Sequence, residues 1–212
     1  MTVKALTLAV GIGLAVCCLQ ADEKEVLPLQ PSALFDIGGA LPPFDILNDR
    51  GEIWKSADHV GKKALVLYFY PGDFTGGCIK QAQAFRDELA RLEGLGVELV
   101  GVSGDEVATH KLFKEAHNLT HTLLADPEGA LAERLGIPVQ RPAKPAKVRT
   151  RDADGKPLMD AQGKSVFVER KVTLARWTLI FGPDGALASK RKNVDPAQDA
   201  DEVAKFVETL KR

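Results

Sequence analysis

The sequence predicts an α/β fold built around a central sheet. Two continuous apolar runs, over residues 64–70 and 97–103, have the composition of strands that are buried on both faces. After the first run the apolar residues recur at intervals of three and four, which is a helical spacing. Strands that alternate with helical segments are typical of proteins whose sheet is covered by helices.

The composition narrows the class of protein. The chain has 212 residues, 45% of them hydrophobic and 27% charged, and its net charge is −1. These values fit one soluble globular domain with an appendage. The balanced charge excludes a strongly basic nucleic-acid binder and an acidic disordered tail, and three cysteines exclude a disulfide-rich scaffold. Cys17 and Cys18 are adjacent, which leaves Cys78 alone in the body of the chain.

Residues 1–21 have the pattern of a secretory signal peptide. Lys4 precedes an unbroken run of apolar or small residues over 5–19, and abruptly polar sequence follows. We therefore expect cleavage after Ala21 and an exported protein, periplasmic or extracellular. Two alternatives stay open: an uncleaved membrane anchor, for which the run is short of the ~20 residues that span a bilayer, and a lipoprotein signal at Cys17.

The body of the chain is expected to be a single domain over residues 42–212, after a leader rich in proline and glycine over residues 22–41. The residue types and their spacing predict its elements in chain order. These are a strand over 44–47, a turn over 48–51, a strand over 64–70, a helix from Cys78 that ends near Gly94 and Gly96, a strand over 97–103, a helix over 109–117, a strand over 122–125, a short helix over 130–135, a strand over 174–181, a turn over 182–185, a strand over 186–190 and a helix near the C-terminus.

Residues 140–172 interrupt this alternation. They contain prolines and two turn signals, and they have few apolar residues before 166–168. We interpret them as an inserted loop that closes as a hairpin between residues 147–151 and 165–170. We expect its positive charge to form a solvated surface, and the alternative is a docking patch for an anionic partner or a membrane. The charge comes from Lys144, Lys147, Arg149 and Arg151.

Cys78 lies where a buried strand has ended and a helix starts. A thiol at a helix N-terminus faces unpaired N–H groups and the positive end of the helix dipole, which favour the nucleophilic thiolate. Gly76 and Gly77 allow the backbone to bend so that N–H groups converge on an anion. Thr75 offers a hydroxyl within one turn of the sulfur. A lone buried cysteine is commonly inert, but the glycine-rich turn favours a reactive thiol here.

The motif Pro71-x-x-x-Thr75-x-x-Cys78, placed after an aromatic-rich strand, resembles the active-site signature of the peroxiredoxins. It is most similar to the bacterioferritin-comigratory or Q-type branch. The resemblance extends from about Leu41 to the C-terminus, apart from the insertion, and includes the blocks 123–129 and 176–185. It implies a thioredoxin fold, in agreement with the predicted α/β plan. It also implies a thiol-dependent peroxidase for hydrogen peroxide and organic hydroperoxides.

The resemblance implies roles for four residues. Cys78 would be the peroxidatic cysteine, which a peroxide oxidises to a sulfenic acid. Thr75 would hold the peroxide or the thiolate by a hydrogen bond, and Pro71 would shield the sulfur from water. Arg176 would bring a fixed positive charge to the sulfur and the peroxide, because negative charge develops on the departing oxygen. The resemblance implies neither a cofactor nor a metal.

The sequence departs from this family pattern at three positions. Gln81 stands where these families usually have a glutamate, and Gly76 replaces a common proline. Gln83 occupies the position of the resolving cysteine found in many members of the branch. We therefore expect a one-cysteine enzyme that is regenerated by an external thiol, either a thioredoxin-like protein or a low-molecular-weight thiol. We expect a monomer or homodimer that binds no nucleic acid.

Two other functions fit part of the sequence. An exported thiol–disulfide oxidoreductase would carry Cys-x-x-Cys at this helix start, but Thr75 occupies the first of those positions. A non-catalytic thioredoxin-fold binding module would recruit a partner through the basic insertion and would tolerate loss of Cys78. We expect no metal site, because the histidines do not cluster with Cys78, and we expect each to be solvated or on a helix surface. They are His59, His110, His117 and His121.

Overall fold

The computed structural model describes residues 36–210. The predicted signal peptide, with Cys17 and Cys18, lies outside the described residues, as does the leader up to residue 35. Within residues 36–210, no helix has both the length and the apolar character needed to cross a membrane.

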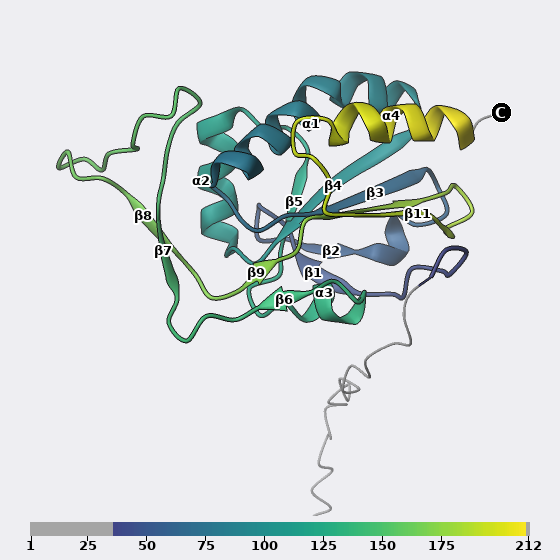
Figure 1. Ribbon diagram of the computed structural model, residues 1–212, viewed down its shortest axis with the longest axis horizontal. Helices are drawn as coiled ribbons and strands as arrows, with labels where there is room; N and C mark the ends of the chain where they lie inside the picture. The colour runs from purple at the N-terminus through teal and green to yellow at the C-terminus, as the bar shows by residue number, and fades with distance from the viewer. Residues whose placement is uncertain (1–35, 211–212) are drawn as a thin grey trace, which may run out of the picture.

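A five-stranded mixed sheet forms the centre of the molecule, with the strand order β11-β10-β3-β4-β5 (Figure 1). The strands β3, β4 and β5 are parallel to one another, whereas β10 is antiparallel to both β3 and β11. This arrangement confirms the predicted α/β plan with a central sheet. The strands are β3 (Ala64–Phe69), β4 (Val97–Ser103), β5 (Thr122–Ala125), β10 (Trp177–Phe181) and β11 (Leu187–Lys192).

The strand β3 shows why its sequence is apolar without interruption. Alternate side chains of a strand point to opposite faces of the sheet. Leu65, Leu67 and Phe69 enter one hydrophobic cluster, whereas Val66 and Tyr68 enter the cluster on the opposite face. All of them are at most 1% exposed, so both faces of β3 are covered.

Helices cover one face of the sheet, and smaller elements cover the other. On the first face, α1 and α4 lie side by side, and α2 packs with them (Figure 1). The helices on this face are α1 (Gly76–Gly94), α2 (Val107–His117) and α4 (Asp199–Leu210). The other face carries β1 (Asp45–Leu47), β2 (Ile53–Lys55), the short 3-10 helix η1 (Ser56–Asp58), α3 (Ala130–Arg134), β6 (Val139–Gln140) and β9 (Thr173–Leu174).

Several predicted element boundaries differ from those of the structure, and two of the differences adjoin Cys78 and Arg176. Residues 174–181 are not one strand, because β9 pairs with β6 while β10 joins the central sheet, and Ala175 and Arg176 connect them. The helix α1 begins at Gly76, two residues before the predicted start at Cys78. Thr75 is already its N-terminal cap, since the Thr75 carbonyl accepts a hydrogen bond from the Ile79 amide at 2.9 Å.

The insertion forms the predicted hairpin. Its strands β7 (Ala146–Arg149) and β8 (Phe167–Arg170) pair antiparallel, with Val148 opposite Val168. The hairpin projects from the body of the molecule beyond α2 (Figure 1). The expectation of a solvated basic surface is confirmed for the four residues that carried it, since Lys144, Lys147, Arg149 and Arg151 are exposed.

The expectation that each histidine would be solvated or on a helix surface was wrong for His110, His117 and His121, which are buried. A neutral imidazole tolerates burial when it packs against rings or finds a hydrogen-bond partner. His121 does both, because its Nε2 lies 2.7 Å from the Tyr68 hydroxyl and the two rings pack edge-on. Among residues 36–210, no group of three or more His, Cys, Asp or Glu side chains is arranged to hold a metal ion.

Acidification should destabilise the fold through His121. Burial, assisted by the charge of Lys114, lowers the pKa of His121 from 6.5 to about 3. The unfolded chain therefore takes up this proton first. The free energy of unfolding should fall as the pH drops below 6.5, by about 1.4 kcal/mol per pH unit from this group alone. Denaturant unfolding from neutral to mildly acidic pH should show a shallower pH dependence for His121→Gln, and equal slopes in both proteins would contradict the assignment.

Candidate active site

Cys78 and Arg176 come together because of the direction of two strands. Trp177, the first residue of β10, pairs with Phe69, the last residue of β3. The antiparallel pairing places the end of β3 and the start of β10 at the same edge of the sheet. The helix α1 starts just after this end of β3, and Arg176 directly precedes β10. Two side chains 98 positions apart in the sequence therefore meet.

The guanidinium of Arg176 contacts the sulfur directly. Its Nη2 donates a hydrogen bond to Cys78 Sγ at 3.1 Å. Cys78 is a free thiol, 1% exposed, in the first turn of α1, where backbone amides have no partner within the helix. A fixed positive charge thus contacts a sulfur at a helix N-terminus, and both features stabilise negative charge that develops there.

Gly77 makes room for this contact. A Cβ atom at Gly77 would lie 3.3 Å from Arg176 Nη2 and 3.6 Å from a side-chain carbon of Pro196. Because the first distance is tighter than an ordinary Cβ contact, a larger residue would push the guanidinium away from the helix. Gly77 therefore allows the close approach of a charged side chain, whereas Gly76 has no atom near its Cβ position. The expected backbone bend at Gly76 and Gly77 is not observed, because both are helical residues of α1 and neither has a positive φ.

A buried hydrogen-bond chain holds Arg176 in this position. Its Nη1 donates to Gln81 Oε1, and Gln81 Nε2 donates to Asp199 Oδ2 at 2.8 Å. The same carboxylate oxygen accepts a hydrogen bond from the Thr178 hydroxyl at 2.7 Å. Burial raises the pKa of Asp199, and the hydrogen bonds from Thr178 and Gln81 oppose that rise. From the sequence, Gln81 was distinguished only as a departure from glutamate, and neither Asp199 nor Thr178 was predicted for the site.

Thr75 and Pro71 lie in the loop that precedes α1. Thr75 is half-buried, and its hydroxyl donates to the Gly72 carbonyl at 3.1 Å but accepts no capping hydrogen bond from an amide of α1. Pro71 is half-buried and lines a cavity of about 220 Å³, together with Ala175, the residue before Arg176. Thr75 thus lies directly before α1, and Pro71 lies beside the residue that precedes Arg176. The roles of both residues toward a peroxide stay predictions.

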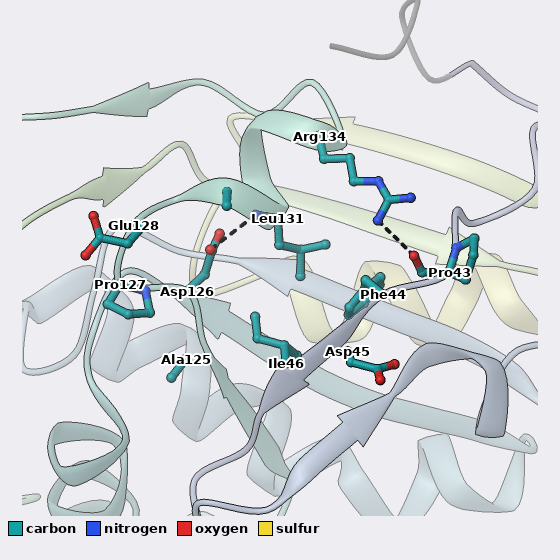
Figure 2. A pocket seen from close by; sticks show the side chains of 11 residues that line it. Pro43, Phe44, Asp45, Ile46, Ala125, Asp126, Pro127, Glu128, Leu131 and Arg134 are labelled. Carbon is teal, nitrogen blue, oxygen red and sulfur yellow. Dashed lines mark hydrogen bonds between the residues drawn. The ribbon is translucent and has the colours of Figure 1, made fainter. Parts of the chain in front are cut away.

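A wider apolar cavity, of about 610 Å³, lies on the other face of the sheet (Figure 2). Its wall includes Leu131, which belongs to the hydrophobic cluster on the face opposite Cys78. The Asp126 carboxylate in its wall accepts hydrogen bonds from the amides of Leu131 and Ala132 at 3.2 and 2.9 Å. Arg134 donates to the Pro43 carbonyl at 2.8 Å. These polar groups hold α3 and the chain before β1, and the cavity is separate from the thiol site.

Fold and site together define a thioredoxin-fold protein with an arginine-supported cysteine at the start of a helix. The model of the AhpC/TSA family matches residues 37–190, so the chain belongs to that family. This confirms the resemblance to the peroxiredoxins, which are thiol-dependent peroxidases.

Individual relatives agree with this assignment. The peroxiredoxin bcp of Coxiella burnetii is 41% identical over 106 residues, which is 50% of this chain and 70% of that protein. The chloroplastic peroxiredoxin Q of Suaeda salsa is 40% identical over 100 residues, and the chain spans only 47% of its length. The solved structure of peroxidoxin BcpB from Mycobacterium tuberculosis has a TM-score of 0.66 at 20% identity, covering 84% of this chain and 99% of that one. The bacterioferritin comigratory protein of Xanthomonas campestris has a TM-score of 0.61 at 23% identity, covering 80% and 92%.

Loss of the Gln81 side-chain amide should slow the reaction of Cys78 with a peroxide. Gln81→Met removes the acceptor that orients Arg176, and a lost hydrogen bond to a charged group corresponds to about a tenfold change in rate. Rapid-mixing measurement of thiol loss with hydrogen peroxide gives the rate constant. Lys80→Met is the control, because Lys80 is exposed on the same helix. Equal rates for the two variants would show that Gln81 does not orient Arg176.

Proposed function

We propose that the protein reduces hydrogen peroxide and organic hydroperoxides to water or an alcohol through a sulfenic acid on Cys78. The observation that carries this proposal is the Arg176 guanidinium that donates to the buried sulfur in the first turn of α1. The sulfur attacks one peroxide oxygen and the O–O bond breaks. The second oxygen departs with the bonding electron pair and takes up a proton, which leaves Cys78 as a sulfenic acid. Arg176 and the first amides of α1 stabilise the departing charge.

In this mechanism Thr75 holds the peroxide through its hydroxyl, and Pro71 limits access of water to the sulfur. The support is their place in the short loop that delivers Cys78, together with the family signature that they complete with it. Both residues are half-buried, so part of each side chain is open to a small molecule.

We propose that an external thiol completes the cycle. Its sulfur attacks the sulfenic sulfur and releases water, and a second thiol then resolves the mixed disulfide to regenerate Cys78. The support is that Cys78 is a free cysteine within residues 36–210, and that Gln83 stands at the position of the resolving cysteine. A thioredoxin-like protein or a low-molecular-weight thiol has the required chemistry.

Hydrogen peroxide should convert Cys78 to a sulfenic acid much faster than it oxidises free cysteine. The protein without residues 1–21, which lacks Cys17 and Cys18, is reduced and mixed with one equivalent of peroxide, alongside its Cys78→Ser variant. Peroxide consumption and intact mass after sulfenic-acid trapping are followed. Rapid consumption with a trapped adduct on Cys78, absent from the variant, is the expected result. A rate equal to that of free cysteine would overturn the proposal and favour the non-catalytic binding module.

We further propose that residues 1–21 direct export and are removed. The support is the charge of Lys4 followed by the apolar run over residues 5–19. When the full chain is expressed in a bacterium with a periplasm, the periplasmic fraction should contain protein whose N-terminal residue is Asp22. Protein that retains Met1 to Ala21 and stays in the cytoplasm would contradict this assignment, and retention in the membrane would favour the anchor or the lipoprotein.

A further inference from the structure

Arg170 belongs to the inserted hairpin, yet its side chain is only 5% exposed. Alternation along β8 turns Val168 and Arg170 toward the body of the molecule and leaves Phe167 and Glu169 exposed. Val168 packs against the same hydrophobic cluster that contains Cys78, as does Val148 from the facing strand. The hairpin therefore has a basic outer face and an inner face that lies against the body.

The guanidinium of Arg170 holds the loop that leads to α1. Its Nε donates to Asp105 Oδ1 at 2.9 Å, and its Nη2 donates to the Asp73 carbonyl at 2.7 Å. The other oxygen of Asp105 accepts a hydrogen bond from the Asp73 amide at 2.7 Å. Both backbone polar groups of Asp73 are thus bound to one buried ion pair between Arg170 and Asp105.

Gly72 shows how closely the guanidinium approaches this loop. A Cβ atom at Gly72 would lie 2.0 Å from Arg170 Cζ, so the guanidinium occupies the space that any other side chain would need. The backbone of Gly72, at φ +150°, also lies in a region that L side chains rarely adopt. Gly72 therefore accommodates an arginine from the insertion, a role that its place in the sequence does not indicate.

The loop over residues 72–74 leads directly into Thr75 and the first turn of α1. Phe74 has a φ of 59°, a left-handed conformation that is uncommon for a bulky residue, and its ring packs edge-on against Phe113. The Thr75 hydroxyl donates to the Gly72 carbonyl, and α1 begins at the next residue. The conformation of residues 72–74 therefore determines where the Thr75 hydroxyl and the first turn around Cys78 lie.

Arg170 also balances buried negative charge. The carboxylates of Asp73 and Asp105 are fully buried, and Asp73 is bound by His110 Nδ1 at 2.8 Å and by the Tyr70 hydroxyl at 2.8 Å. Burial and the charge of Asp73 raise the pKa of Asp105, and the charge of Arg170 opposes that rise. Without Arg170, Asp105 would lose its buried cationic partner, and His110 alone would oppose the charge of the two carboxylates. An unpaired buried charge destabilises the conformation that buries it.

We propose that Arg170, supplied by the inserted hairpin, is a positioning residue for the reaction of Cys78: its guanidinium fixes residues 72–74 and, through them, the Thr75 hydroxyl and the first turn of α1. This inference rests on the proposed peroxidase function. The inserted hairpin then contributes to the active site through Arg170, on its inward-facing side.

The test compares two reactions of the same sulfur in the full chain. Arg170→Met removes the guanidinium, and Arg170→Lys is the second variant, because it keeps the buried positive charge but loses the forked geometry. Arg149→Met is the control, on the exposed face of the same hairpin. Oxidation by hydrogen peroxide and alkylation by iodoacetamide are both followed in the tryptic peptide of residues 64–80, which contains Cys78 but neither Cys17 nor Cys18.

Both Arg170 variants should react about 100-fold more slowly with peroxide, the cost of an active group displaced by about 1 Å. Their alkylation rate should fall much less, because alkylation requires the thiolate but does not require the Thr75 hydroxyl to be aligned with a peroxide. The control should match the unsubstituted chain in both reactions. An unchanged peroxide rate in Arg170→Lys, or an equal fall in both reactions, would overturn the inference.

Hydrogen exchange at the Asp73 amide separates this inference from the proposed function. Exchange should be faster in Arg170→Lys, because the ion pair that holds Asp105 against this amide is weakened. If the unsubstituted chain reacts with peroxide no faster than free cysteine, the proposed function fails and the positioning role fails with it, even where exchange is faster. If the unsubstituted chain is reactive but exchange at Asp73 is unchanged, only the role of Arg170 is overturned.

Discussion

The antiparallel pairing of β10 with β3 is the constraint on which the site depends. Because Trp177 pairs with Phe69, Arg176, the residue before β10, lies at the edge of the sheet where β3 ends and α1 begins. Both strands are buried on both faces, so a slip by one residue would turn their apolar side chains to the wrong cluster. The register that the hydrophobic core imposes is therefore also the register that places Arg176 on the sulfur of Cys78.

Two polar networks contact the segment that carries Cys78. Gln81 and Asp199 hold Arg176 from the side of α4, whereas Arg170 and Asp105 hold the loop before the helix. Buried charges of this kind add little to stability unless every group has a partner. Their effect is to restrict the conformations open to the segment that carries the reactive sulfur.

The residues predicted for the site were those with a local signal. Cys78 and Thr75 belong to one short motif, and Arg176 begins a block that resembles the peroxiredoxins. The structure brings Cys78 and Arg176 together. Asp199 starts a surface-lying helix, where an acidic residue is ordinary, and nothing nearby distinguishes it. Arg170 had the same residue type as its exposed basic neighbours, and only the pairing of β7 with β8 shows that it faces inward.

The sequence by itself determined the α/β plan, the strands of the central sheet, the hairpin in the insertion and the position of the cysteine at a helix start. These features depend on apolar periodicity and turn residues, which act over a few neighbouring positions. The tertiary structure decided the break between β9 and β10, the burial of His110, His117 and His121, and the contacts that hold the arginines. Those outcomes depend on which distant segments pack together, because a polar side chain is buried only where another part of the chain supplies its hydrogen-bond partner or an apolar surface to pack against.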